Sequence, residues 1–365
     1  MHLPIRQAVC VLARMKNLVF AIMLLAASSL HPRAAMAQPQ PNELEHQSVA
    51  VTTSEGLKLA AYVTRPSGTR ERLPALFLTQ WVSCGSIAPR TDRVSMEERV
   101  GFAAGFALIR VDRAGTGESE GPGCDKLDYD TEVRHYREAL AQLRHHEWID
   151  PRRIVVYGSS LGSTTAPLVA LGDDVAGVIV QGAGALTYFE RMLHFDRIQL
   201  EREADFDPSK IQHEMLRRME FQRLYLFGKM TPAEIEASHP HLRGVFTSLL
   251  GTDEAPHYGR PYAWHWQAAE KDWLAAWAQI DAPVMVVYGE YEQFESRHGH
   301  RLIVDTINRL RPGTARWLEI PGAGHDMAIY PDPYAAYRFE GGVSQPELFA
   351  GPVSEWLRSV AGSAS

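Results

Sequence analysis

Two adjacent serines, Ser159 and Ser160, follow an apolar, β-branched stretch that ends at a glycine. Residues Gly158 to Gly162 match the pattern G-x-S-x-G, with Ser160 at the centre and Ser159 at a variable position. Small flanking residues let such a chain turn sharply from a strand into a helix, which lifts the central side chain clear of the sheet. The N–H groups at the start of that helix then face a developing oxyanion. The pattern predicts that Ser160 is a nucleophile, and a glycine-rich helix start without chemistry is the alternative.

A nucleophilic serine needs a general base and a carboxylate that orients the base. His325 lies just beyond the last apolar stretch, in the glycine-rich segment PGAGHDM. Glu290, Glu292 and Glu295 follow the preceding apolar stretch, PVMVVYG. The order serine, acid, histidine along the chain is the one that accompanies this type of turn. We therefore expect His325 to be the base and one of the three glutamates to be the acid.

Strands and helices must position these side chains. Short apolar runs predict strands at residues 73–80, 106–112, 154–157, 176–180, 283–288 and 315–320. In residues 46–66, apolar and polar side chains alternate, which predicts a β-hairpin. Helical spacing occurs at residues 92–104 and 129–148, from residue 160 onward, and at 346–360. Strands that are apolar throughout and alternate with helices predict an α/β fold: a mostly parallel, mixed sheet with helices on both faces.

Residues 187–277 interrupt this alternation. They contain helical segments rich in Arg, Glu, Met and aromatic residues, and they are too long for a loop in a compact domain. We interpret them as a helical cap inserted over the C-terminal edge of the sheet. The core is then formed by residues 38–186 and 278–365.

The N-terminus predicts export. Lys16 precedes an apolar run that ends at Leu30, and Ala35 and Ala37 form an A-x-A site. These features are typical of a signal peptide, residues 1–37, cleaved after Ala37, so we expect a periplasmic or secreted protein. A membrane anchor is the alternative. The apolar run is shorter than the roughly 20 residues of a bilayer span, so we expect no stable anchor after cleavage.

The composition is that of a globular protein, with 45% hydrophobic and 22% charged residues among 365. A formal net charge of -7 gives no indication of a nucleic-acid partner. Of three cysteines, Cys84 and Cys124 lie after the signal peptide. An exported chain would keep this pair in an oxidising compartment.

Four segments carry a resemblance: YGSSLGS, VDRAGTGES, VVYGEYEQF and PGAGHDM. Together they resemble the α/β-hydrolase superfamily, serine hydrolases that include members with a helical cap, over nearly all of the chain after the signal peptide. WVSCGS and GESEGPGCD further resemble exported esterases and prolyl-oligopeptidase-like hydrolases. Family members commonly carry Asp three residues after the glycine that ends the seventh strand. The same spacing from Gly289 falls on Glu292, so the resemblance implies that Glu292 is the acid.

The resemblance also assigns residues around the nucleophile. Family members usually carry His-Gly after the third strand, where this chain has Thr79-Gln80-Trp81. By position, the oxyanion hole would be formed by the backbone N–H groups of Trp81 and Leu161. The strands that precede Cys84 and Cys124 are neighbours in the family fold. The resemblance therefore implies a disulfide between these cysteines at the rim of the site.

The resemblance implies an esterase-like serine hydrolase that cleaves a small ester, an amide or a short peptide through an acyl-enzyme, without cofactor or metal. A peptidase and an acyltransferase use the same machinery and stay open. A non-catalytic binding protein on the same fold is the alternative from another class. Because esters have the better leaving group, we favour the esterase.

Overall fold

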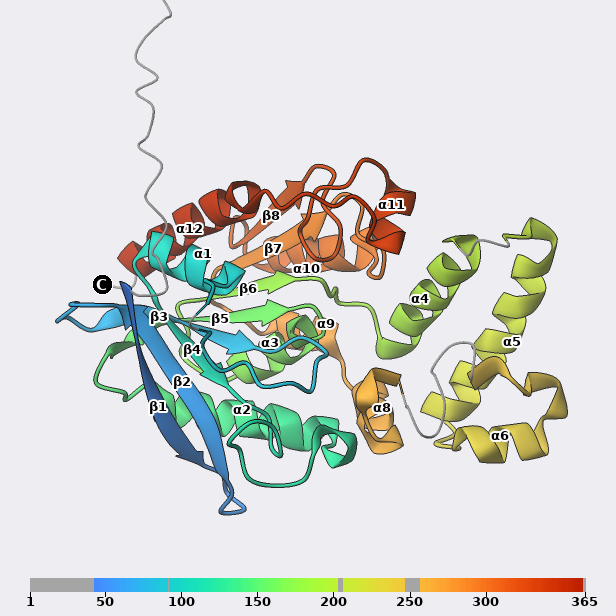
Figure 1. Ribbon diagram of the computed structural model, residues 1–365. Coiled ribbons are helices and arrows are strands. Elements are labelled where there is room, and N and C mark those ends of the chain that lie inside the picture. The colour runs from blue at the N-terminus through green and yellow to red at the C-terminus, as the bar shows by residue number, and fades with distance from the viewer. Residues whose placement is uncertain (1–42, 91, 203–205, 247–256, 364–365) are drawn as a thin grey trace, which may run out of the picture. The chain divides into compact units, whose positions relative to one another are not determined.

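Residues 43–90, 92–202, 206–246 and 257–363 are described by the computed structural model of the protein. Within these ranges, eight strands form one sheet in the order β1-β2-β4-β3-β5-β6-β7-β8 (Figure 1). The pairs β1–β2 and β2–β4 are antiparallel, and the remaining pairs are parallel. The strands are β1 (Leu44–Thr52), β2 (Lys58–Pro66), β3 (Leu73–Thr79), β4 (Ala107–Val111), β5 (Ile149–Ser159), β6 (Gly177–Gln181), β7 (Val284–Gly289) and β8 (Ala315–Ile320). The predicted mostly parallel, mixed sheet is confirmed.

The central strands are buried on both faces, which explains their uninterrupted apolar runs. Phe77 on β3, Val156 on β5 and Val180 on β6 are fully buried. Phe77 pairs with Val156, and Val180 pairs with Val286 on β7. This register aligns the carboxyl ends of the four strands at one edge of the sheet, where the candidate catalytic residues follow.

Helices cover both faces of the sheet (Figure 1). One apolar core contains residues of α1 (Met96–Ala104) and α12 (Pro346–Ser363). The core on the other face contains residues of α2 (Tyr129–Leu143), α3 (Gly162–Ala170), α9 (Trp273–Ala278) and α10 (Arg297–Leu310). A short helix, α11 (Pro333–Arg338), precedes α12.

Two helices are shorter than their periodicity predicts. Helix α1 begins at Met96 rather than at residue 92, because Ser95 and Glu98 form a capping box. Helix α2 begins as predicted, after the N-cap Asp128, but ends at Leu143. The residues that follow α2 form a turn that leads into β5.

Helices also fill most of the described sequence between β6 and β7: α4 (Tyr188–Arg202), α5 (Pro208–Leu226), α6 (Pro232–Ser238), α8 (Tyr262–Ala269) and α9. Helices α4, α5, α6 and α8 lie beyond the carboxyl ends of the central strands, outside the two helical layers (Figure 1). They share an apolar core that includes Tyr188, Phe221 and Trp264. A cap domain with the boundaries 187–277 stays a prediction.

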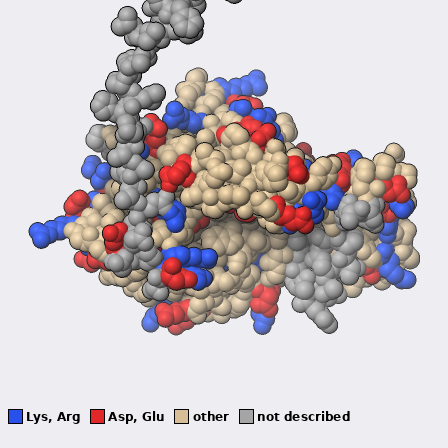
Figure 2. Space-filling view, turned by 45° about the horizontal axis from the view of Figure 1, so that its top comes forward, with Lys and Arg blue, Asp and Glu red and all other residues tan. Residues whose placement is uncertain are grey.

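The predicted signal peptide, residues 1–37, lies outside the described residues. Among the described helices, none combines the length and the apolar character that crossing a membrane requires. On the face drawn in Figure 2, basic and acidic side chains are interspersed between neutral ones.

Candidate active site

Ser160 lies in a tight turn between β5 and α3. Its backbone is left-handed, with φ of 50°, and its N–H donates to the Gln181 carbonyl at 2.6 Å. The flanking glycines are sterically required. A Cβ on Gly162 would overlap the Thr79 carbonyl, and a Cβ on Gly158 would lie 2.7 Å from the Gly162 carbonyl oxygen. The turn therefore projects the Ser160 side chain from the edge of the sheet, as the glycine pattern predicts.

His325 lies in the loop after β8 and faces Ser160. Its Nε2 lies 2.7 Å from Ser160 Oγ. The loop is held on both sides of the ring, because the His325 N–H donates to Gln293 Oε1 at 2.9 Å and the His325 carbonyl accepts from Gln181 Nε2 at 2.7 Å. The imidazole is thus fixed within hydrogen-bond distance of the serine hydroxyl.

The structure brings one of the three candidate glutamates to this histidine. Glu292 Oε2 and Oε1 lie 2.8 and 3.0 Å from His325 Nδ1. Glu290 instead accepts the N–H of Gly322, and Glu295 forms a buried ion pair with Arg191. Ser160, His325 and Glu292 therefore form a continuous hydrogen-bonded chain.

Burial and charge set the ionisation of this chain. Burial alone would raise the pKa of Glu292, but the charge of His325, its hydrogen bond and the N–H of Phe294 outweigh burial and lower the pKa. Burial alone would lower the pKa of His325, but the charge and hydrogen bonds of Glu292 outweigh burial and raise the pKa. Glu292 is therefore a carboxylate at neutral pH, and it stabilises the protonated imidazole.

Trp81 and Leu161, the expected oxyanion donors, lie in the same cavity as Ser160 and His325. Leu161 directly follows the serine and precedes the first turn of α3. Among the described residues, no protein acceptor lies at the backbone N–H of Trp81 or of Leu161. Both N–H groups are thus available to a bound molecule, and their role as an oxyanion hole stays a prediction.

The cavity has a volume of about 510 Å³ and mainly apolar walls. Its other lining residues come from the loop after β3, from α1, β5 and β6, from the helical segment 187–277, from the loops after β7 and β8 and from α12: Val82, Met96, Glu97, Tyr157, Ser159, Gln181, Arg191, Phe195, Tyr258, Phe294, Glu295, Asp326, Met327 and Phe349. The contributions of Arg191, Phe195 and Tyr258 had no signal in the sequence, since helical spacing does not show which face meets a cavity. In the described ranges, no three His, Cys, Asp or Glu side chains are grouped to hold a metal ion.

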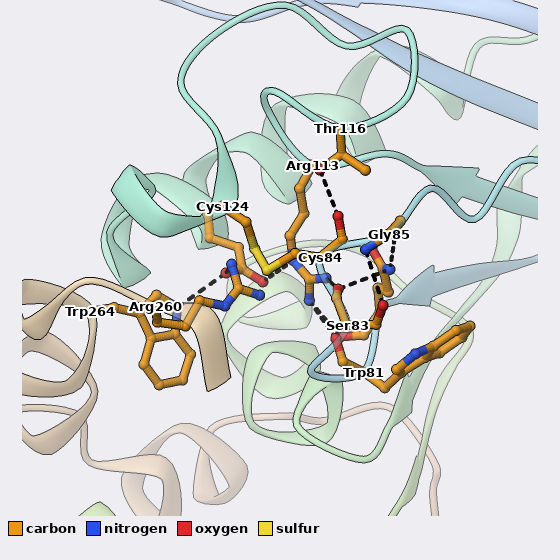
Figure 3. Close-up of a disulfide and its surroundings, with 11 residues drawn as sticks. Trp81, Ser83, Cys84, Gly85, Arg113, Thr116, Cys124, Arg260 and Trp264 are labelled. Atoms are coloured by element: carbon orange, nitrogen blue, oxygen red, sulfur yellow. Dashed lines mark hydrogen bonds and ion pairs between the residues drawn. A yellow bond between two sulfur atoms is a disulfide. The ribbon is translucent and has the colours of Figure 1, made fainter. Parts of the chain in front are cut away.

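The expected disulfide is present beside the candidate site (Figure 3). It joins Cys84, in the loop after β3, to Cys124, at the start of the short helix η2 (Cys124–Lys126) after β4. The two Cα atoms are 5.7 Å apart. Thr116 Oγ1 also donates to the Cys84 carbonyl at 3.2 Å. The bridge thus connects the loop that carries Trp81 to the loop after β4.

Comparison with known proteins identifies relatives. The family model described as "Alpha/beta hydrolase family" matches residues 91–337. Polyketide transferase ATR5 of Stachybotrys chlorohalonatus is 30% identical over 141 residues, which are 38% of this chain and 45% of that protein. Quorum-quenching protein AidA of Acinetobacter baumannii is 30% identical over 129 residues, 35% of this chain and 41% of that protein. The match spans less than half the length of either relative.

Solved structures share the fold at low sequence identity. An esterase from Pyrococcus furiosus superimposes with a TM-score of 0.51 and 13% identity, over 88% of this chain and 97% of the esterase. At this identity the likeness concerns the fold alone.

Proposed function

Because the chain belongs to the alpha/beta hydrolase family, we propose that it is a serine hydrolase that cleaves carboxylic esters through an acyl-enzyme. One observation carries the proposal: Ser160 Oγ, His325 and Glu292 form a hydrogen-bonded chain with distances of 2.7 and 2.8 Å. This arrangement gives a serine hydroxyl both a base and a group that stabilises the charged base.

The reaction follows from these positions. His325 Nε2 takes the proton of Ser160 as Oγ attacks the ester carbonyl carbon, and the carbonyl oxygen becomes an oxyanion that faces the N–H groups of Trp81 and Leu161. The protonated imidazole, stabilised by Glu292, then donates its proton to the departing alcohol. A water molecule, deprotonated by the same imidazole, attacks the acyl carbon. The bond to Ser160 Oγ then breaks, and the imidazolium returns its proton to Oγ as the free acid leaves.

The cavity supports an ester with an apolar acyl or aryl group. Its walls include Phe195, Phe294 and Phe349, and a volume of about 510 Å³ suits a small molecule.

Acyl transfer is the second candidate, because a relative is named a polyketide transferase. In that reaction an alcohol replaces water in the second step. A peptidase would use the same residues on an amide, which has the poorer leaving group.

We further propose that residues 187–277 are a cap domain that completes this cavity. Arg191 and Phe195 of α4 line the cavity together with Ser160 and His325 of the core, which supports the proposal. Substrate preference should then follow substitutions in α4 more than substitutions in the sheet.

We also propose that residues 1–37 are a signal peptide and that the mature chain is periplasmic or secreted. The disulfide between Cys84 and Cys124 supports this location, since disulfides persist in oxidising compartments. Cell fractionation with N-terminal sequencing tests it, and a cytosolic chain that retains residues 1–37 would contradict it.

A fluorophosphonate probe tests the nucleophile. We expect labelling of the wild type and of Ser159→Ala, and no labelling of Ser160→Ala. Ser159 is the matched control, because it is the adjacent serine and also lines the cavity. Labelling that persists in Ser160→Ala would reject the assignment of the nucleophile.

A substrate panel tests the reaction. It contains aryl esters of increasing acyl length, peptide amides, and the best ester with added alcohol. Faster turnover of esters supports the esterase. Faster turnover of amides would favour a peptidase, and alkyl ester as the main product would favour the transferase.

A further inference from the structure

The loop after β3 is held by one buried arginine, Arg113. Its Nη2 donates to the carbonyls of Gln80 and Trp81 at 2.9 and 2.8 Å, and its Nη1 donates to the carbonyl of Ser83 at 2.6 Å. Figure 3 shows the guanidinium beside Trp81 and Ser83, with dashed lines to the loop. Arg113 lies just after β4, two residues beyond its end at Val111. Its hydrogen bonds therefore connect the segments that follow the neighbouring strands β3 and β4, at the edge of the sheet where these strands end.

These contacts act on the peptide that carries the candidate oxyanion donor. The Gln80 carbonyl and the Trp81 N–H belong to the same planar, trans peptide, so the two groups point in opposite directions. Because Arg113 binds the carbonyl, the N–H points away from the guanidinium. A rotation of this peptide would break the charge-assisted hydrogen bond between Gln80 and Arg113. The positive charge on the carbonyl side also polarises the peptide, which strengthens its N–H as a donor.

Glu132, on α2, fixes the guanidinium in turn. Its Oε1 accepts from Arg113 Nε at 2.7 Å, and both side chains are almost fully buried. Its Oε2 accepts from Trp264 Nε1 at 3.1 Å and lies 3.3 Å from Arg260 Nη1. All three nitrogens of the Arg113 guanidinium therefore have partners, and the group has a single well-defined orientation.

Stability alone does not explain this arrangement. The cost of removing two charges from water offsets most of the attraction within a buried ion pair, so an apolar pair of similar size often stabilises as well. The geometric fork of an arginine, by contrast, gives a fixed orientation to several acceptors at once. A loop whose backbone N–H must keep one direction requires this fixed orientation of its carbonyl groups.

We propose that Arg113, held by Glu132, is the positioning residue of the oxyanion hole: it orients the Gln80–Trp81 peptide so that the Trp81 N–H faces the substrate oxygen. The inference rests on the proposed serine hydrolase function and adds a residue outside the triad on which turnover depends. Arg113 itself does not contact the substrate.

The test compares Arg113→Met and Arg113→Lys with the wild type. Arg113→Met removes the fork, while Glu132 retains Arg260 as its counter-ion. Arg113→Lys retains the charge, but one ammonium cannot hold three carbonyls in the same way. The matched control is Arg110→Met. Arg110 is a buried arginine three residues earlier, and its ion pair is with Glu98 of α1.

Three measurements separate positioning from a general structural role. With an aryl ester, Arg113→Met should lower kcat about 100-fold, the scale of a lost oxyanion donor, and leave KM within about threefold. Binding of a boronic acid, whose oxygen occupies the oxyanion hole, should weaken by a similar factor. Hydrogen exchange of residues 80–85 should be faster than in the wild type.

The variants should differ in a defined order. Arg113→Lys should recover part of kcat. The Arg110→Met control should keep kcat within about threefold of the wild type, although its melting temperature falls at least as far, because Glu98 loses its counter-ion.

A folded Arg113→Met protein with kcat and boronic acid affinity within threefold of the wild type would overturn the proposal. If Arg113→Met does not fold, Arg113→Lys decides, and a wild-type kcat in that variant overturns the proposal as well.

If the wild type neither hydrolyses esters nor reacts with the fluorophosphonate, the proposed function is wrong. Hydrogen exchange then still decides on positioning, and unchanged exchange of residues 80–85 in the variants rejects it.

Discussion

Replacement of Glu292 by Gln probes the proton transfer most directly. Glu292 Oε1 accepts the N–H groups of Phe294 and Glu295 at 2.8 and 3.2 Å, whereas Oε2 is the atom nearer to His325 Nδ1, at 2.8 Å. In Glu292→Gln the amide oxygen should take the Oε1 position, because backbone N–H groups need an acceptor there. The amide NH2 then takes the Oε2 position and donates to Nδ1.

This orientation places the imidazole proton on the wrong nitrogen. With Nδ1 as an acceptor, the neutral His325 carries its proton on Nε2, the atom that should accept the proton of Ser160. The change therefore removes both the base and the carboxylate charge. We expect kcat to fall by a factor of about 10⁴, the loss seen when a triad carboxylate becomes an amide, or about 5 kcal/mol of transition-state stabilisation.

The pH profile gives an independent readout. In the wild type, kcat/KM should fall as the pH drops through the pKa of His325, which Glu292 raises above the ordinary value of 6.5 despite burial. In Glu292→Gln burial remains and the raising charge is gone, so the acid limb should move to lower pH. The assay is the residual ester hydrolysis between pH 4 and pH 9.

Glu290→Gln is the matched control. Glu290 is exposed and accepts the N–H of Gly322, so its replacement should keep kcat within about threefold. An acid limb in Glu292→Gln that stays in place or moves to higher pH would refute the reasoning. So would a Glu292→Gln protein with kcat within tenfold of the wild type while Glu295→Gln loses turnover.

Three further predictions concern stability. Ser160→Gly should be about 1 kcal/mol more stable to urea than the wild type or Ser160→Ala, because φ of 50° strains residues with a Cβ; equal stability of the glycine and alanine variants would contradict this. The double variant Cys84→Ser, Cys124→Ser should lose about 4 kcal/mol of unfolding free energy, because the disulfide restricts the unfolded chain by closing a loop with a sequence separation of 40. Two free thiols in the denatured, unreduced wild type would contradict the presence of the disulfide. Burial raises the pKa of Asp196 to about 6 from 3.8, so its contribution to stability is fully present below pH 3.8 and is lost as the pH rises through about 6. Urea unfolding at pH 4 and pH 8 should show the wild type losing about 2 kcal/mol relative to Asp196→Asn, and an equal change in both proteins would contradict this.

The sheet was predictable because its strands are buried on both faces. The predicted range 315–320 coincides with β8, and the apolar run 283–288 differs from β7 by one residue at each end. Helix α10, by contrast, was not predicted, although Ile303, Val304 and Ile307 have helical spacing and Ser296 caps its start. This signal was present in the sequence.

The site was less predictable than the fold. The glycine pattern and the chain order single out Ser160 and His325, whereas only the family spacing distinguishes Glu292 from the other two glutamates as the candidate acid. In the structure, short-range contacts distinguish the glutamates: two backbone N–H groups orient Glu292, and Glu295 is paired with Arg191. The contacts of Arg113 had no sequence signal at all, because its partners are main-chain carbonyls and the residue types that carry them do not reveal their direction.

The distribution of the site over four strand ends has a consequence for how the chain becomes active. Trp81 follows β3, Ser160 follows β5, Glu292 follows β7 and His325 follows β8, so the proposed nucleophile and its proposed base are 165 positions apart in the chain. Synthesis begins at the N-terminus, so β8 is the last strand of the sheet to emerge. Long-range parallel pairing is also slow, because loop closure precedes any gain from the contacts. If His325 is the base of Ser160, a nascent chain that still lacks β8 holds this serine unactivated, and we expect fluorophosphonate labelling to begin only after β8 has docked.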